Sequence, residues 1–340
     1  MVLAAKIKQP DAQSLIVYLK EHDLFNSRFK SQTKKGFLYF AVKQEFKLRD
    51  VTFEEVADDF FELAKQRMTL REALRDKLTE EELSEFKSAF DQVGSIAILE
   101  IDEQLRHKEK VIGETLLELN SAIKTVLRKD GKHRGTFRNQ PMKLISGVDT
   151  REATFIENGV RMFVDVEKVY FSSRLANERV RIADQISDTE DVLVMFSGAA
   201  PQALVIEKRA NPKSITGIEI NPAGHECGLK SMKLNKFKKT KLICGDVHEV
   251  SRKLDVKYDR IIMNLPKTAH EFLGDAVRLL KPNGILHYYD FLHEDEFALA
   301  EDRVSAAAAK QNRKVEFSGI YTVGSQGIKT YRICLDVKIF

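Results

Sequence analysis

The stretch DVLVMFSGAAPQALVIEKRANPKSITGIEI, residues 191–220, has the pattern of a strand, a turn of small residues, a helix and a second strand. Further strand patterns follow at 241–246, 259–264 and 284–291, separated by helical segments. Strands that alternate with helices predict a parallel, doubly wound sheet, so the fold class is α/β. The final segment TYRICLDVKIF, 330–340, alternates in polarity and is expected to be an antiparallel edge strand closing this sheet.

The chain has 340 residues, which is too long for one ordinary core and predicts two or three domains. We place a small α+β domain at 1–66, with helices at 11–25 and from Thr52 and a strand at 36–42. A second α+β domain at 67–164 begins with a charged helical stretch. The α/β domain occupies 165–340.

The composition excludes several classes of protein. The net charge of +4 fits an anionic partner but also an ordinary solvated surface. Three scattered cysteines without CxxC spacing predict a reducing, cytoplasmic setting rather than a disulfide framework. The start carries no secretion signal, and no apolar stretch approaches the ~20 residues that span a membrane. The histidines lack metal-ligand spacing, so no metal is expected.

Polar and small residues follow four successive strand patterns. Gly198 lies in the turn after the first, and Glu219, Asp246 and Asn264 end the next three. Each alone has an ordinary explanation, such as a surface carboxylate or an Asn-Leu-Pro turn. Together they lie where parallel sheets bind ligands, and they suit an adenosine, with Glu219 on the ribose hydroxyls and Asp246 on the adenine amino group. Because no GxGxxG occurs, S-adenosylmethionine fits better than a dinucleotide.

Several segments resemble one family, the archaeal and eukaryotic tRNA (guanine-N1)-methyltransferases that modify position 37 beside the anticodon. The resemblance implies a Rossmann-like S-adenosylmethionine-dependent methyltransferase domain preceded by two smaller α+β domains, with tRNA as the partner. We expect a monomer. The segments are KVYFSSRLANERVRIAD (168–184), GIEINP (217–222), GDVHEV (245–250), DRIIMNLPKTAHEFL (259–273), LKPNGILHYYDF (280–291), FDQVGSIAILEI (90–101) and TVLRKDGKHRGTFRNQPMKLISG (125–147).

The resemblance departs from the family at the first donor-binding motif, which typically has the form F-A-G-V-G-P-F with an acid two positions before it. Here the second glycine is Ala200, the second phenylalanine is Gln202, and Val194 replaces the acid. These changes concern the part of the site that would hold the methionine end of the donor.

The resemblance also assigns roles to individual residues. It makes Glu178 the general base, although the residues alone favour a surface salt-bridge cluster of Glu178 with Arg174 and Arg181. Asn264 would hold the guanine edge, and Arg138 would contact the guanine O6 atom. Arg174 and Arg179 would contact the carboxylate of the donor or a nearby RNA phosphate. The expected donor-binding residues are Arg174, Arg179, Phe196, Gly198, Glu219, Ile220, Asn221, Asp246, Val247, Asn264 and Pro266.

The densest basic run of the chain surrounds Arg138 and includes Arg128, Lys129, Lys132 and Arg134, which we expect to contact RNA phosphates. Two other functions stay open. The first is aminocarboxypropyl transfer in wyosine-type base synthesis, or an enzyme that also methylates a tricyclic intermediate. The second is a tRNA-binding protein whose donor site has decayed, which the altered first motif favours.

Overall fold

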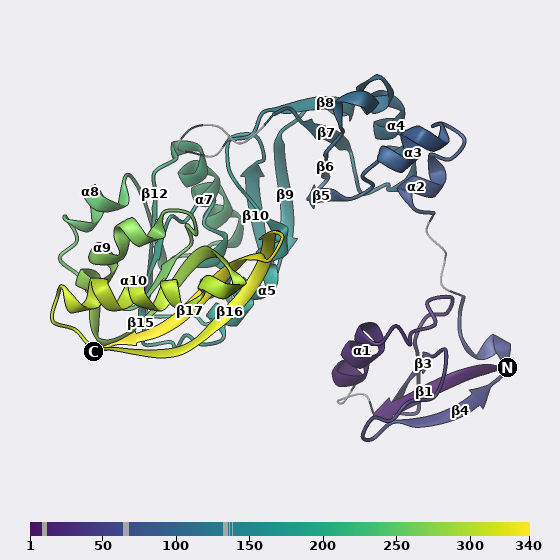
Figure 1. Ribbon diagram of the computed structural model, residues 1–340, viewed down its shortest axis with the longest axis horizontal. Coiled ribbons are helices and arrows are strands. Elements are labelled where there is room, and N and C mark those ends of the chain that lie inside the picture. Colours follow the sequence, from purple (N-terminus) through teal and green to yellow (C-terminus); the bar gives the residue numbers. More distant parts are fainter. Residues whose placement is uncertain (9–11, 64–67, 132–134, 136, 138) are drawn as a thin grey trace. The chain divides into compact units, whose positions relative to one another are not determined.

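The computed structural model describes residues 1–8, 12–63, 68–131, 135, 137 and 139–340. The chain forms two compact units, Met1–Glu72 and Ala73–Phe340 (Figure 1). Within the described part of the chain, no helix is both long and apolar enough to cross a membrane.

The first unit is a four-stranded antiparallel sheet in the order β2-β3-β1-β4, with helix α1 packed on it. Its elements are β1 (Val2–Lys8), α1 (Ala12–Glu21), β2 (Gln32–Lys34), β3 (Phe37–Ala41) and β4 (Thr52–Val56). The helix predicted from Thr52 is wrong, because this segment pairs with β1 and places Phe53 opposite Ala5. Sheet pairing and burial of Phe53 against the core around Leu15 outweigh the local helical pattern.

The second unit begins with a four-stranded sheet in the order β5-β6-β7-β8. Strands β6 and β7 are parallel, and helix α4, which connects them, packs on β7 and β8. The predicted helical stretch forms two short helices. Helix α2 (Leu70–Ala73) spans the division between the two units. The elements that follow are α3 (Glu80–Glu85), β5 (Phe90–Val93), β6 (Ile96–Leu99), α4 (Glu109–Leu119), β7 (Thr125–Lys129) and β8 (Met142–Gly147).

A hairpin of β9 (Glu152–Glu157) and β10 (Val160–Asp165) connects this sheet to the rest of the unit. Val160 and Met162 of β10 belong to the hydrophobic core of the C-terminal domain. Ala153 and Val164 instead pack in a cluster with side chains of β5, β6 and β7. The hairpin is therefore shared by two cores, and a domain boundary at 164/165 stays a prediction.

The C-terminal domain contains a seven-stranded sheet in the order β13-β12-β11-β14-β15-β17-β16. The first five strands are parallel, as predicted. Strand β17 pairs antiparallel with β15 on one side and with β16 on the other. The strands are β11 (Asp191–Met195), β12 (Ser214–Glu219), β13 (Thr240–Cys244), β14 (Tyr258–Met263), β15 (Leu280–His293), β16 (Val315–Gly327) and β17 (Thr330–Ile339).

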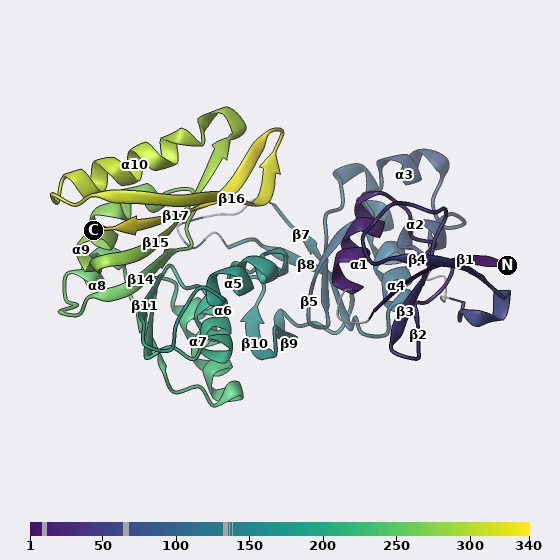
Figure 2. The ribbon, with the colours of Figure 1, turned by 90° about the horizontal axis from the view of Figure 1, so that it is seen from below.

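Helices cover both faces of this sheet. The core on one face combines β11 side chains with Ile182 and Leu204 of α5 and α6. The opposite core contains Leu273 and Val304 of α9 and α10, and Figure 2 shows α10 across the sheet from α5, α6 and α7. The helices are α5 (Ala176–Ala183), α6 (Pro201–Arg209), α7 (Pro222–Asn235), α8 (Val247–Ser251), α9 (Leu273–Leu279) and α10 (Ala298–Ala309).

The prediction that the last segment closes the sheet as its edge strand is wrong. Segment 330–339 forms β17, but β16 pairs along its outer side and is the edge. The β16 pattern is weak because it contains Gly319, Gly324 and Gly327 and shifts register three times along β17. Glycines and bulges of this kind are common in edge strands and hide the period-two alternation.

Candidate active site

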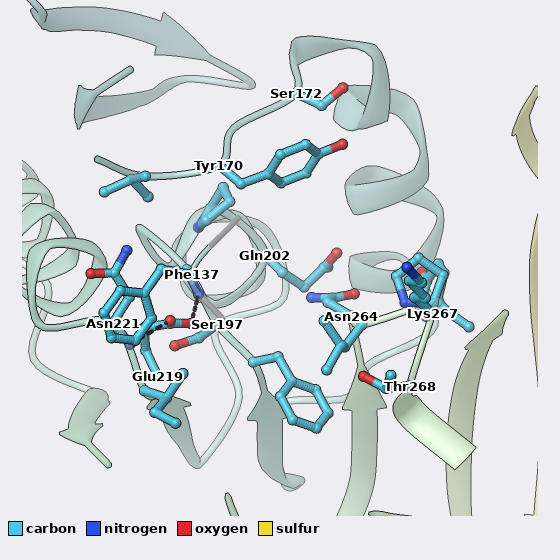
Figure 3. Close-up of a pocket in the computed structure, with 18 of the residues that line it drawn as sticks. Phe137, Tyr170, Ser172, Ser197, Gln202, Glu219, Asn221, Asn264, Lys267 and Thr268 are labelled. Atoms are coloured by element: carbon cyan, nitrogen blue, oxygen red, sulfur yellow. Dashed lines mark hydrogen bonds between the residues drawn. The ribbon is translucent and has the colours of Figure 1, made fainter. Parts of the chain in front are cut away.

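A cavity of about 540 Å³ opens at the carboxyl ends of the parallel strands. The four residues predicted from the strand ends, Gly198, Glu219, Asp246 and Asn264, all line it. Glu219 and Asn264 come from the ends of different strands and are drawn together in Figure 3. The structure thus brings together residues that are up to 66 positions apart in sequence, counted from Gly198 to Asn264.

The turn after β11 has an unusual backbone. Phe196, Gly198 and Ala200 have positive φ angles of 61°, 57° and 63°. A left-handed backbone is costly for non-glycine residues, by roughly 1–2 kcal/mol each. The methyl of Ala200 nevertheless fits, because Gly228 of α7 lies against it and leaves room that a side chain would fill. The substitution of the second motif glycine is therefore accommodated within the turn.

Glu219 is fixed by the backbone around it. Its Oε2 accepts a hydrogen bond from the Gly198 amide at 2.6 Å, and its Oε1 accepts one from the Asn221 amide at 2.8 Å. Burial raises the pKa of the Glu219 carboxyl, and the backbone donors oppose this shift. Asn221 in turn caps α7 and donates to the Lys168 carbonyl. The remaining lone pairs of Glu219 can accept hydroxyl groups in the cavity.

Asp246 combines capping with a free oxygen. Its Oδ1 accepts hydrogen bonds from the amides of His248 and Glu249 at 2.8 and 3.4 Å and so caps α8. Its Oδ2 has no partner among the residues that the structure describes. The cavity therefore contains one carboxylate oxygen available for an amino group. Ile220 and Val247 supply apolar surface next to it.

The Asn264 end of the cavity is partly aromatic. Phe196 packs edge-on against Phe272 with 4.8 Å between ring centroids, and Phe272 stacks on His248 with 4.1 Å between ring centroids. The Asn264 carboxamide has no hydrogen-bond partner among described residues, while its backbone amide donates to the Met195 carbonyl. Pro266 lies two positions further along the same lining. The carboxamide is thus held by its backbone and is free to bind a planar polar edge.

Glu178 of α5 lines the same cavity, and its side chain is 9% exposed. It accepts two hydrogen bonds from Arg181 at 2.7 and 2.8 Å and one from the Tyr289 hydroxyl at 2.6 Å. The pair of Glu178 with Arg181 that the alternative predicted is present, but it is not exposed and Arg174 has no part in it. Arg174 is 74% exposed, lies outside this cavity and pairs with Asp91 at 2.7 Å.

The expectation that Arg179 contacts the donor carboxylate is not supported by its surroundings. Arg179 lines the cavity, but two parallel hydrogen bonds of 2.6 Å join its guanidinium to Glu157 of β9. It also donates to the Ser172 carbonyl. The charge of Arg179 is thus neutralised within the protein, where it ties α5 to the β9–β10 hairpin.

The predicted RNA-binding run divides into three groups. Arg128 is 4% exposed and pairs with Glu109 and Asp130, so the expectation that it contacts phosphate is wrong. Lys129 lies 3.8 Å and 3.9 Å from Asp91 and Glu100, which leaves its ammonium group weakly paired. Lys132, Arg134 and Arg138 lie outside the described residues.

Several lining residues were not predicted from sequence. Phe137 and Gly135 reach the cavity from the loop after β7, and Tyr289 reaches it from β15. Gln202, at the altered motif, is buried and donates from its amide to the Arg179 carbonyl at 3.2 Å. Only Tyr289 carried a usable signal, since it lies late in a parallel strand, where side chains approach the binding edge.

Replacing Asp246 with Ala is expected to weaken S-adenosylmethionine binding by roughly 1–3 kcal/mol, the cost of losing a charged hydrogen-bond partner. Isothermal titration calorimetry measures this directly. Asp255 is exposed on the loop after α8, and Asp255→Ala should leave donor affinity unchanged. Native affinity in Asp246→Ala would remove this residue from the donor site.

One edge of the parallel sheet presents the turn at Gly198, the carboxylate of Glu219 and the unpaired Oδ2 atom of Asp246. This is the arrangement of a Rossmann-like S-adenosylmethionine-dependent methyltransferase. Residues 153–316 match the TRM5/TYW2 methyltransferase domain, and residues 70–150 match the TYW2 N-terminal domain.

Whole-length relatives agree with this class. The chain is 33% identical to the tRNA (guanine(37)-N(1))-methyltransferase Trm5b of Pyrococcus abyssi over 100% of this chain and 99% of the relative. The crystal structure of Trm5b from Pyrococcus abyssi superposes with a TM-score of 0.74, covering 100% and 99% of the two chains.

Two further solved structures carry ligands. Trm5 of Methanocaldococcus jannaschii in complex with adenosine is 31% identical over 99% of each chain, with a TM-score of 0.66. A complex of aTrm5 with tRNALeu is 29% identical over 99% of this chain and 100% of that one, with a TM-score of 0.70. The chain belongs to the TRM5/TYW2 family of methyltransferases.

Proposed function

We propose that this enzyme transfers the methyl group of S-adenosyl-L-methionine to N1 of guanine 37 in tRNA. The observation that carries the proposal is one cavity with two sets of residues. Glu219 and Asp246 suit an adenosine, while the buried carboxylate of Glu178 and the free carboxamide of Asn264 suit a purine edge. The likeness to Trm5b over the whole chain and to the aTrm5–tRNALeu complex supports the same substrate.

The residues of the cavity fit S-adenosyl-L-methionine. Its volume lies within the range of small-molecule sites, roughly 300–1,000 Å³. Glu219 can accept the ribose hydroxyls, the free oxygen of Asp246 can accept the adenine amino group, and the turn at Gly198 lets a ligand approach the backbone. When bound, this donor supplies an electrophilic methyl group on a sulfonium centre.

Guanine N1 carries a proton at neutral pH, so methylation at N1 requires a base. Donor binding leaves two lining carboxylates unused, Glu178 and the exposed Glu271. Glu178 is the one that is held in place, by Arg181 and Tyr289. In the proposed step the N1 proton goes to Glu178, and the electron pair on N1 forms the new bond to the methyl carbon. Asn264 holds the guanine edge with its carboxamide, so that the reacting atoms meet in a fixed geometry.

The target base has to leave the anticodon-loop stack to reach a cavity of this kind. Phe137 and Gly135 of the loop after β7 line the cavity, so this loop is placed to contact the extruded nucleotide. Arg138 follows Phe137 in the sequence but lies outside the described residues, and its contact with O6 stays a prediction. The monomeric state and the cytoplasmic location are likewise proposed, and size-exclusion chromatography tests the first of them.

A pair of tRNA transcripts tests the substrate. With methyl-labelled donor, an unmodified transcript with guanine at position 37 should take up one methyl group per molecule. The same transcript with adenine at position 37 should take up none. Equal labelling of both transcripts would contradict the assignment to position 37.

A further inference from the structure

A chain of buried polar side chains extends from Glu178 into the protein, away from the cavity. Arg181 joins Glu178 to Asp336 of β17, donating to the Asp336 carboxylate at 2.7 and 3.3 Å. Asp336 also accepts a hydrogen bond from His287 at 2.6 Å. The donor site and the guanine edge do not require this network.

The far end of the network is anchored by a second ion pair. His287 Nε2 lies 2.8 Å from a nitrogen of Arg260, and Arg260 pairs with Glu190 at 2.7 Å. Burial lowers the pKa of His287, so the ring is neutral and donates its Nδ1 proton to Asp336. Burial opposes ionisation of Asp336, but hydrogen bonds from His287 and Arg181 lower the pKa of this carboxyl.

The cluster of His287, Cys334 and Asp336 has ligand types that metals use, but its hydrogen bonds argue against a metal site. Both ring nitrogens of His287 already have partners, and Cys334 lies 3.3 Å from Asp336. Burial raises the pKa of the Cys334 thiol well above its ordinary value, so it keeps its proton. The three side chains therefore form a hydrogen-bond network.

The charges near Glu178 explain what the network does. Arg181 is the single cation shared by two carboxylates, those of Glu178 and Asp336. Paired with Glu178 alone, its full positive charge would stabilise the ionised carboxylate and make it a weaker base. Because Asp336 shares the guanidinium, the two carboxylates and Arg181 together carry one net negative charge. A proton arriving on Glu178 would cancel this charge.

Tyr289 acts on Glu178 from another strand and in the opposite sense. Its hydroxyl donates to Glu178 Oε1 at 2.6 Å. Burial raises the pKa of Tyr289 well above its ordinary value, and nearby Cys334 and Glu178 add to the shift. The hydroxyl therefore stays protonated and donates to the Glu178 carboxylate.

We propose that Asp336 and Tyr289 are positioning residues that tune Glu178 as a base in opposite directions. Asp336 strengthens the base by sharing Arg181, and Tyr289 weakens it by donating to Oε1 while holding the carboxylate toward the cavity. This inference rests on the proposed role of Glu178 in removing the N1 proton. The titratable and charged groups next to Glu178 are Arg181 of α5, Tyr289 of β15, and Cys334 and Asp336 of β17. Arg179 and Arg332 line the same cavity.

The test compares single-turnover methylation rates across pH for two variants with saturating enzyme and donor. Tyr289→Phe keeps the ring but loses the donor, so the acidic limb of the profile should move to higher pH by about one unit, the size of one hydrogen bond. Asp336→Asn keeps the shape of the side chain but removes the negative charge that shares Arg181, so Glu178 becomes the sole carboxylate partner of this guanidinium. Its acidic limb should move to lower pH by about one unit, and its plateau rate should fall about tenfold, since the base is weaker.

Tyr288→Phe is the matched control. Tyr288 is the neighbouring residue on the other face of β15, and its hydroxyl donates to Asp290 at 2.5 Å. The same substitution there should leave the limb in place. Donor affinity and far-UV circular dichroism should be native in all three variants. Tyr289→Phe loses only one oxygen atom, so it tests the proposal even if Asp336→Asn does not fold.

The outcomes separate this inference from the function on which it rests. Shifts of opposite sign support it. Shifts of the same sign, or no shift, overturn it. If the Glu178→Gln variant is nevertheless slow and lacks the acidic limb, the role of Glu178 as the base stays intact. A Glu178→Gln variant with the native rate overturns both.

Discussion

Replacing Glu178 with Gln is expected to lower the single-turnover rate of methyl transfer by roughly 10²–10⁴-fold, the usual contribution of a positioned base. Glutamine keeps the size of the side chain and one hydrogen-bond acceptor, so both substrates should still bind. The native rate should rise with pH along an acidic limb, and this limb should be absent in the variant. Rapid-quench kinetics with enzyme in excess follow the chemical step before product release.

Glu226 offers a matched control for this substitution. It is exposed on α7 and does not line the cavity, so Glu226→Gln should react at the native rate. A Glu178→Gln variant that methylates at the native rate would show that Glu178 is only a structural partner of Arg181. The N1 proton would then require another acceptor.

Breaking the buried pair of Arg179 and Glu157 is expected to have the largest effect on stability. Both side chains are nearly buried, at 5% and 9% exposure. Glu157→Ala leaves the Arg179 guanidinium buried without its carboxylate, which typically lowers the free energy of unfolding by roughly 3–5 kcal/mol. Urea unfolding followed by circular dichroism measures the change.

An exposed pair provides the comparison for the buried one. Arg252 and Glu249 lie 3.3 Å apart with 68% and 64% of their side chains exposed. Arg252→Ala should therefore change the free energy of unfolding by less than about 1 kcal/mol. A similarly small change in Glu157→Ala would contradict the structural role of Arg179 and make a donor contact the better account of this residue.

The sequence predicted the parallel sheet because its strands are nearly continuous apolar runs between clear helical segments. Gly198, Glu219, Asp246 and Asn264 could be placed in one site for a related reason, since strand ends in such a sheet share an edge. Strand β16 could not be predicted, because glycines and register shifts remove its alternation. Segment 52–56 was misassigned because its partner strand lies at the start of the chain.

Charged residues were the least predictable from sequence. Arg128 and Arg179 look like solvent-exposed cations in the sequence, but their carboxylate partners, Glu109 and Glu157, lie 19 and 22 residues away. Arg181, three positions from Glu178, was a visible partner, but Tyr289 was not, because it comes from β15. Asp336 of β17, the second carboxylate on Arg181, was equally hidden. Pairings of this kind depend on tertiary structure and leave no periodic signal.

Methyl transfer to guanine 37 yields two products, and one experiment identifies both. Unmodified tRNA transcript and S-adenosyl-L-methionine are incubated with the enzyme, and nucleosides and small molecules are separated by liquid chromatography with mass spectrometry. We expect 1-methylguanosine at position 37 and an equal amount of S-adenosylhomocysteine. Formation of methylthioadenosine with an aminocarboxypropyl nucleoside, or no modified nucleoside at all despite bound tRNA, would contradict this expectation.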